Sequence, residues 1–213
     1  MQTASRYVPC PVDGTPVDTL SGRRGPSGTY CSNACRQKAY RDRQPPAALR
    51  KRDRWVRWTL TSDGRKLPLQ AERHRNASVS DPRTWSSYAV ARKSEVGTGL
   101  GYVLGDGIGC IDLDDCLDAA GVLSPLAQEV LGANPDAWVE RSQSGRGLHV
   151  WGLLDEGPGR TTKEIEVYSR GRYIALGTTF RVGGLSQLIA PALEQRAIHC
   201  RRRLLGGTQE LKK

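Results

Sequence analysis

Two aspartates at the end of an apolar stretch are the first residues whose types and spacing could do chemistry. In Ile111-Asp112-Leu113-Asp114, apolar and acidic residues alternate. Because strand side chains alternate between faces, Asp112 and Asp114 are predicted to share one face, about 6.5 Å apart along the strand. Two carboxylates this close favour a cation between them, and hard ions such as Mg2+ or Mn2+ prefer oxygen ligands. The alternative is an exposed acidic strand edge.

A third carboxylate, Glu166, has a similar setting. It lies between two apolar residues in a run that predicts a strand over residues 164–168. Glu166 should therefore face away from the apolar side of that strand and could join the two aspartates. Three carboxylates suit Mg2+ or Mn2+ better than a softer metal.

A glycine-rich turn separates these acidic positions in the sequence. It runs from Ser144 through Gly145, Arg146 and Gly147 and leads into His149. Glycines let the backbone approach an anion closely, and the hydroxyl and guanidinium groups add donors. On its own, a glycine-rich turn usually has no ligand-binding role. Beside the carboxylates, it predicts a phosphate site next to metal ions, as two-metal phosphoryl chemistry requires.

Four residues near the N-terminus have the types and spacing of a metal site. Cys10 and Asp13 precede a loop rich in Gly, Pro and Arg, and Cys31 and Cys35 follow it. A segment with so few apolar residues cannot form a stable core and needs another source of stability, such as a bound metal. Three thiolates and a carboxylate can hold Zn2+, so we expect a zinc site. The alternative is a decayed site with three idle thiols.

The elements that must position these residues can be predicted from periodicity and turn signals. The expected strands cover residues 55–60, 99–104, 108–114, 137–141, 148–151, 164–168 and 172–176. Turns at residues 105–107 and 169–171 are expected to close hairpins between their flanking strands. Helices are expected to start at Ser32 and at Asp81, the second reaching about Lys93. Further helices are expected near residues 117–131 and 191–204.

The acidic and glycine-rich motifs together resemble those of archaeo-eukaryotic primases. They follow the order hydrophobic-D-hydrophobic-D at residues 111–114, S-G-x-G-x-H at 144–149 and hydrophobic-D/E-hydrophobic at 165–167. Over about residues 53–182 the chain resembles the bifunctional primase–polymerase (prim-pol) domain of phages and plasmids. The resemblance implies an α/β fold whose catalytic core is an RNA-recognition-motif-like (RRM-like) sheet.

The same resemblance implies a role for each motif residue. The carboxylates of Asp112, Asp114 and Glu166 would be catalytic and would hold Mg2+ or Mn2+. Ser144 and His149 would contact the triphosphate of the incoming nucleotide. The full nucleotide-binding set, with two arginines added here as phosphate donors, is Ser144, Gly145, Arg146, Gly147, His149 and Arg172.

Residues 10–41 resemble short treble-clef-like zinc ribbons of the form C-x2-C followed by Y-C-S-x2-C-R-Q-x-A-Y-R. The segment departs from that form at Asp13, where a cysteine is expected. The predicted organisation is a zinc-binding module at residues 1–44, a basic linker at 45–52, a catalytic prim-pol domain at 53–190 and a basic C-terminal helix or tail at 191–213.

Charge is unevenly distributed along the chain. Residues 1–58 carry 12 basic and 4 acidic side chains, residues 59–195 carry 14 and 17, and residues 196–213 carry 6 and 1. Basic flanks around an acidic centre predict arms that bind single-stranded DNA beside a site that holds cations. The alternative is that the flanks only improve solubility. No signal-like or membrane-spanning apolar run occurs, which predicts no membrane partner and a cytoplasmic protein of a bacterial cell or phage-infected host.

These features predict a template-directed nucleotidyltransferase, a DNA primase or polymerase that makes or extends primers from dNTPs or NTPs. No G-x4-G-K-[ST] motif occurs, so the helicase often fused to such domains would be a separate protein or absent. The main alternative is a non-catalytic DNA-binding replication or regulatory module on the same scaffold. A two-metal nuclease would not explain the turn at 144–149, and His74, His149 and His199 are too scattered for a rolling-circle nicking site.

Overall fold

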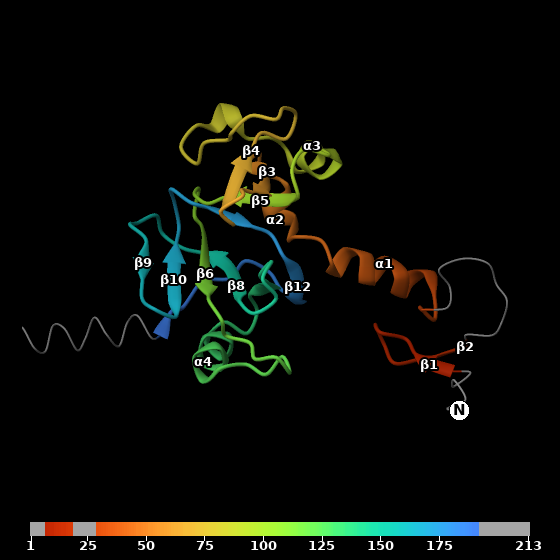
Figure 1. Cartoon of the computed structure of the whole chain (residues 1–213). Coiled ribbons are helices and arrows are strands. Elements are labelled where there is room, and N and C mark those ends of the chain that lie inside the picture. The colour runs from red at the N-terminus through yellow and green to blue at the C-terminus, as the bar shows by residue number, and fades with distance from the viewer. Residues whose placement is uncertain (1–6, 19–28, 192–213) are drawn as a thin grey trace, which may run out of the picture. The chain divides into compact units, whose positions relative to one another are not determined.

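The computed structural model describes residues 7–18 and 29–191, which fall into two units (Figure 1). The first unit is Met1–Pro45 and holds the predicted zinc ligands. The second is Pro46–Lys213 and holds the predicted catalytic residues. The helix or tail predicted for the C-terminus lies outside the described residues from position 192 onwards.

The first unit combines a short hairpin with one helix. Strands β1 (Tyr7–Pro9) and β2 (Pro16–Asp18) pair antiparallel. Helix α1 (Asn33–Asp42) begins, as predicted, directly after Ser32, whose hydroxyl accepts a hydrogen bond of 3.1 Å from the backbone N–H of Cys35. The hairpin turn and the start of α1 therefore carry the predicted zinc ligands.

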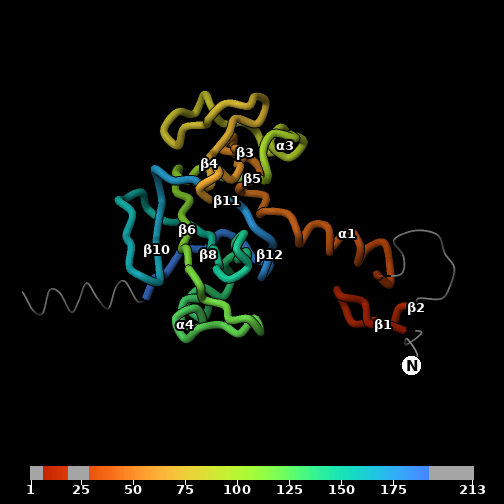
Figure 2. Tube along the Cα trace, viewed as in Figure 1, coloured from red at the N-terminus to blue at the C-terminus, as the bar shows by residue number. Residues whose placement is uncertain are grey.

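The described part of the second unit, residues 46–191, contains two antiparallel sheets, the larger with six strands. These are β6 (Ile108–Leu113), β7 (Trp138–Arg141), β8 (Leu148–Leu153), β9 (Arg160–Thr161), β10 (Ile165–Tyr168) and β12 (Thr178–Arg181). Their order across the sheet is β12-β7-β8-β6-β10-β9. Figure 2 labels β12, β8, β6 and β10 of this sheet. Strands β6 and β8, which contain Asp112 and His149, therefore lie at the centre of the sheet.

The smaller sheet has four strands. These are β3 (Trp55–Leu60), β4 (Lys66–Leu69), β5 (Gly99–Val103) and β11 (Tyr173–Ala175). Their order is β11-β5-β3-β4, and each neighbouring pair is antiparallel. The strand predicted over residues 55–60 is confirmed as β3.

Two predicted hairpins are wrong, because the strands that flank each turn belong to different sheets. Apart from an isolated bridge between Gly105 and Ile108, β5 and β6 do not pair. The turn at residues 169–171 likewise joins β10 of the larger sheet to β11 of the smaller one. Glycine favours a tight bend, but residue type at a bend does not determine which strand each arm pairs with. Both connections carry the chain from one sheet to the other.

Between residues 46 and 190 of the second unit, the helical segments are α2 (Ala47–Arg50), the 3-10 helix η2 (Pro82–Thr84), α3 (Tyr88–Lys93) and α4 (Pro125–Ala133). The helix predicted over residues 81–93 has the predicted start, with Asp81 as its cap, but not the predicted length. Ser86 exchanges two backbone hydrogen bonds with Trp55, which draws the chain into an extended conformation between η2 and α3. Among the described residues, no helix has the length and apolar character needed to span a membrane.

The two faces of the larger sheet pack against different elements. On one face, α4 covers the alternating apolar residues of the central strands, among them Ile111, Leu113 and Val150. On the other face, Trp151 packs against Tyr102 of the smaller sheet, with ring centroids 5.9 Å apart. Since residues two apart on a strand share a face, Asp112 and His149 lie on this second face, beside the aromatic contact.

Helix α2 falls within residues 45–52, which were expected to form a basic linker. Its Leu49 is fully buried and belongs to the same apolar cluster as Trp55 and Tyr102. The Leu49 carbonyl also accepts a hydrogen bond of 3.2 Å from the indole N–H of Trp55. The basic residues around Leu49 give the segment a polar pattern, but one leucine anchors it to the core of the second unit.

Leu49→Ala should therefore destabilise the second unit by about 2–5 kcal/mol, because it leaves a cavity in a closed core. Denaturant unfolding followed by tryptophan fluorescence measures this change. Leu60→Ala is the matched control, since Leu60 is 54% exposed, and it should cost less than about 0.5 kcal/mol. Equal, small effects of the two variants would show that residues 47–50 serve only as a linker.

Candidate functional site

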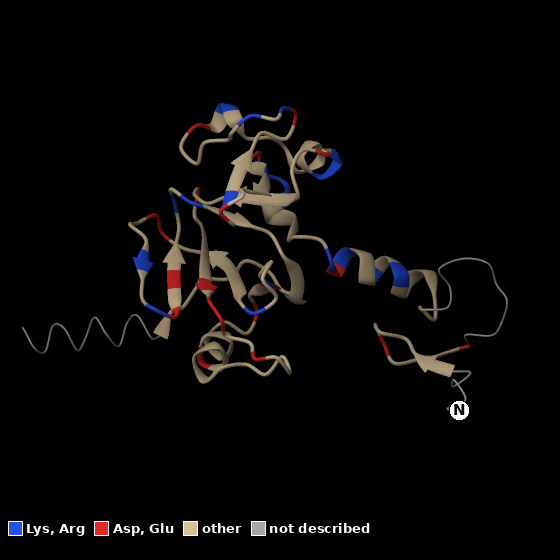
Figure 3. Ribbon diagram, in the orientation of Figure 1, with Lys and Arg blue, Asp and Glu red and all other residues tan. Residues whose placement is uncertain are grey.

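Four polar residues form one row across the larger sheet. Glu140 of β7 lies opposite His149 of β8, His149 lies opposite Asp112 of β6, and Asp112 lies opposite Glu166 of β10. Directly opposed residues of an antiparallel ladder project to the same face, with Cα atoms about 4.5–5.5 Å apart. Figure 3 shows the acidic positions of β6 and β10 on these neighbouring strands. The sheet thus aligns three predicted site residues, Asp112, His149 and Glu166.

Asp112 is the most enclosed of the three predicted Mg2+ or Mn2+ ligands. Its side chain is 16% exposed, and one carboxylate oxygen lies 3.5 Å from Nε2 of His149. Burial raises the pKa of Asp112; His149 acts to lower it, and the negative charges of Asp114 and Glu166 raise it further. A carboxylate in this setting gains from any cation that binds beside it.

Glu166 is held by two neighbours. The Tyr168 hydroxyl donates a hydrogen bond of 2.8 Å to its Oε2, and the Arg172 guanidinium forms an ion pair of 3.2 Å with the same oxygen. The Arg172 guanidinium also stacks 4.3 Å from the centre of the Tyr168 ring. Arg172, which was predicted to contact phosphate, therefore lies directly beside a predicted metal ligand.

Asp114 lies just beyond the end of β6 and is exposed. Its charge affects the pKa of Asp112, yet within the described ranges its carboxylate does not converge with those of Asp112 and Glu166 on a single ligand point. The structure therefore aligns Asp112 with Glu166 and leaves Asp114 exposed beyond the end of β6.

The backbone of the glycine-rich turn packs against the end of β6. The Ser142 N–H donates a hydrogen bond of 2.9 Å to the Gly147 carbonyl, and Gly145 adopts a φ of 77°. A Cβ on Gly147 would lie 2.8 Å from the carbonyl oxygen of Leu113. Glycine at position 147 therefore lets the turn approach the acidic end of β6 closely.

Two predicted nucleotide-binding side chains of this turn contact other partners. Arg146 forms an ion pair of 3.0 Å with Asp115. The Ser144 hydroxyl lies 3.0 Å from that of Ser142 and accepts a hydrogen bond from the backbone N–H of Arg146. Both side chains are exposed. Of the S-G-x-G-x-H motif, the residue that the structure brings to the nearby cavity is His149.

A cavity of about 550 Å³ opens beside the polar row. Asp112 and His149 line it together with three cationic residues, Arg65, Lys66 and Arg172. The remaining lining residues are Gly64, Val79, Gly171, Tyr173, Ile174 and Ala175. A carboxylate next to several cations is an arrangement that can accept a phosphate group together with a divalent ion.

Sequence reasoning missed three charged residues of this region. Arg65 and Lys66 follow a turn and have the pattern of a solvated loop, although they line the cavity. Glu140 is fully buried, and its two oxygens accept hydrogen bonds from His149 Nδ1, at 2.8 Å, and from the Gly177 N–H, at 3.0 Å. A single acidic residue within an apolar strand was the signal that could have identified Glu140.

The environment of His149 favours its positive form. Burial acts to lower the pKa of His149, but the hydrogen bond to Glu140 and the charges of Glu140 and Asp112 outweigh burial and raise it. The charge of Lys66 acts in the opposite direction. The imidazole therefore lies between two acidic groups on the sheet and a cation of the cavity wall.

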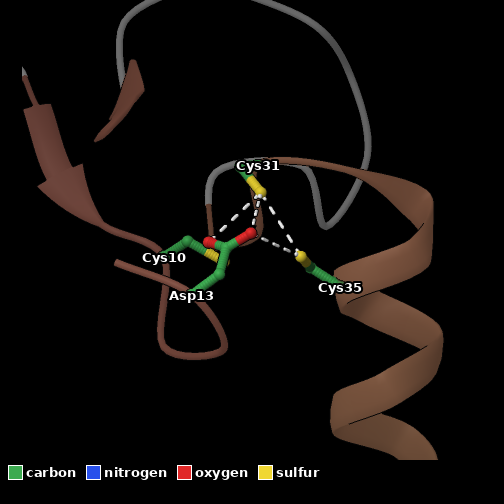
Figure 4. Close-up of side chains that lie close together, drawn as sticks. All are labelled: Cys10, Asp13, Cys31 and Cys35. Carbon is green, nitrogen blue, oxygen red and sulfur yellow. Dashed lines mark hydrogen bonds between the residues drawn. The ribbon is translucent and has the colours of Figure 1, made fainter. Parts of the chain in front are cut away.

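The four predicted zinc ligands lie together in the first unit (Figure 4). One ligand atom from each of Cys10, Asp13, Cys31 and Cys35 lies within 4.8 Å of every other. The Cys31 and Cys35 sulfurs are 3.4 Å apart, and the Cys35 thiol donates a hydrogen bond of 3.1 Å to Asp13 Oδ2. Ligands around a tetrahedral zinc ion are separated by about 3.5–3.8 Å, so these donors fit such an ion. This cluster could bind a metal such as zinc.

The pKa values of the cluster show why a cation would suit it. Hydrogen bonds from Cys35 and from other donors lower the pKa of Asp13, which is therefore a carboxylate. The Ser32 hydroxyl acts to lower the pKa of Cys35, but Asp13 and Cys31 raise it to about 12. Without a cation Cys35 therefore retains its thiol proton, and a zinc ion would displace it.

Comparison of the sequence with known proteins gives no assignment. No protein-family model matches the chain, and no curated protein is significantly similar to it.

Proposed function

We propose that the chain is a template-directed nucleotidyltransferase, a DNA primase or polymerase that synthesises or extends primers. The observation that carries this proposal is the shared register of Asp112, His149 and Glu166 beside a cavity lined by Arg65, Lys66 and Arg172. Carboxylates for divalent ions and cations for phosphates are the two sets of groups that nucleotidyl transfer needs.

Each residue has a distinct role in this proposal. Asp112, Asp114 and Glu166 would hold Mg2+ or Mn2+. Such ions, when bound, activate a 3'-hydroxyl and neutralise the pyrophosphate leaving group. His149 and the cavity cations would bind and orient the triphosphate of a dNTP or NTP, and the turn at residues 144–147 would close the site at the end of β6.

The strand order supports a prim-pol core of the RRM-like type. In chain order, the elements β6, α4, β7, β8 and β10 give a sheet order of β7-β8-β6-β10. An RRM-like sheet also has its first and third strands at the centre and a helix after the first strand. The helix expected between the third and fourth strands does not occur among the described residues here, where β9 lies between β8 and β10.

The proposed partners follow from charge. The basic flanks would bind a single-stranded DNA template, while the acidic site would take nucleotides with their metal ions. Residues 1–45 would form a treble-clef-like zinc module that supports this template binding. A separate replicative helicase would supply the single strand, in the cytoplasm of a bacterial or phage-infected cell.

A primer-synthesis assay tests the proposal. Purified protein is incubated with single-stranded DNA, with dNTPs or NTPs, and with Mg2+ or Mn2+, and the products are separated by size. We expect products that depend on the metal. Comparing reactions with dNTPs and with NTPs shows which of the two nucleotide classes is preferred. Template binding without metal-dependent nucleotide binding or incorporation would instead support a non-catalytic DNA-binding module.

A further inference from the structure

Glu140 has no place among the predicted catalytic residues, yet it is the most deeply buried acidic group of the polar row. It is fully buried, whereas the Asp112 side chain is 16% exposed. A buried ion pair adds little net stability, because desolvation offsets the attraction of its charges. The placement of Glu140 therefore calls for an explanation other than stability.

The contacts of Glu140 fix one neighbour in a single orientation. Its Oε1 lies 2.8 Å from Nδ1 of His149, and its Oε2 accepts a hydrogen bond of 3.0 Å from the Gly177 N–H. The backbone of Gly177 lies close to that of Arg141, since a Cβ on Gly177 would lie 1.7 Å from the Arg141 carbonyl oxygen. With both oxygens engaged, the carboxylate cannot turn away from the ring.

The same contacts determine which ring nitrogen of His149 faces the cavity. Because a carboxylate accepts hydrogen bonds, Nδ1 must carry a proton. The opposite nitrogen, Nε2, then faces Asp112 at 3.5 Å, and His149 lines the cavity with Arg65 and Lys66. A separation of 3.5 Å is longer than a strong hydrogen bond and leaves Nε2 able to contact a ligand.

We propose that Glu140 is a positioning residue, which holds His149 with Nδ1 protonated so that Nε2 contacts a phosphate of the nucleotide. This inference rests on the proposed nucleotidyltransferase function and assigns the triphosphate as the group that His149 meets. Glu140 touches no substrate and acts through the orientation of the ring. An amide in place of such a carboxylate can leave the ring in place and still reverse its tautomer.

Glu140→Gln tests this inference with little change in side-chain volume. The Gly177 N–H requires an acceptor, so the amide oxygen of the variant should face Gly177 and the amide N–H should face Nδ1. Nitrogen NMR of the ring should then move Nδ1 from its protonated to its unprotonated range. His74→Gln and His199→Gln in the background leave His149 as the single histidine observed.

The second readout is the affinity for dATP with Mn2+ in the absence of template. Loss of a well-oriented contact to a charged phosphate should weaken binding about tenfold or more. Glu129→Gln is the matched control, because Glu129 is an exposed acidic residue of α4. It should leave both the ring tautomer and the dATP affinity unchanged.

The outcomes separate this inference from the proposed function. An unprotonated Nδ1 in the unmodified protein would overturn the positioning role without the need for any variant. A reversed tautomer with unchanged dATP affinity would overturn the contact between His149 and phosphate, while primer synthesis could still stand. An unmodified protein that has Nδ1 protonated but binds no dATP would overturn both the inference and the proposed function.

Discussion

Asp112→Asn should reduce nucleotide incorporation on a primed single-stranded template by at least about 1,000-fold. Asp112 lies at the centre of the polar row and, of the three predicted metal ligands, is the one that lines the cavity, so Asp112→Asn removes a charge from the proposed nucleotide site. Because burial raises the pKa of Asp112, its ionised form destabilises the fold at neutral pH, and the amide should not lower the unfolding temperature. Primer extension with Mg2+ and with Mn2+ measures the effect.

Asp115→Asn is the matched control for this prediction. Asp115 is exposed, pairs with Arg146, and adopts a φ of 44°, a conformation that asparagine tolerates. Its replacement should change incorporation by less than about twofold, whereas Asp114→Asn should resemble Asp112→Asn. Unimpaired incorporation by the double variant Asp112→Asn/Asp114→Asn would remove the basis for a two-metal polymerase.

The features that the sequence predicted well depend on local periodicity. The alternation at residues 108–113 placed Asp112 on the face opposite Ile111 and Leu113, and the structure has that arrangement. The spacing of Cys10, Asp13, Cys31 and Cys35 likewise predicted a cluster that the structure contains. In both cases, a few residues within a strand, a turn or a helix start suffice to define the geometry.

The features that the sequence missed depend on contacts between distant segments. The turns at residues 105–107 and 169–171 have the composition of hairpins, but the competing pairing of β5 with β3 and of β6 with β8 assigns their arms to separate sheets. The position of Glu140 opposite His149 became recognisable only once β7 was paired with β8. Arg65 joined the site because the smaller sheet carries its loop to the cavity.

Chelation of the zinc that we expect in the first unit should unfold α1. Within its described residues, the buried members of the hydrophobic cluster are Cys10, Val17 and Cys35, two of which are predicted ligands. So small a core cannot offset the entropy of ordering the chain, whereas zinc binding contributes about 10–16 kcal/mol in comparable modules. We therefore expect bound zinc in the purified protein, and rapid amide hydrogen exchange across residues 33–42 after chelation.

Substitutions at Asp13 test whether the carboxylate is a ligand. Asp13→Ala should lose zinc and the protection of α1, whereas Asp13→Cys should retain both, because a thiolate supplies the fourth ligand. Asp42→Asn is the matched control, since the Lys38–Asp42 ion pair lies on the surface of α1 and contributes little. Protection of α1 that survives both chelation and Asp13→Ala would mean that the thiols are idle.

The same substitutions connect the metal to template binding. The first unit contributes Arg36 and Arg41 on α1, and each phosphate contact on a single strand adds about −0.7 to the slope of log affinity against log salt. Deleting residues 1–45, a cut that spares α2, should weaken template binding at least about tenfold and flatten that slope. Cys35→Ser should do the same, because the basic side chains of an unfolded helix no longer hold a fixed spacing. Both changes should leave dATP binding with Mn2+ intact, since that site lies wholly within the second unit. An unchanged salt slope in the shortened protein would show that the first unit contacts something other than the template.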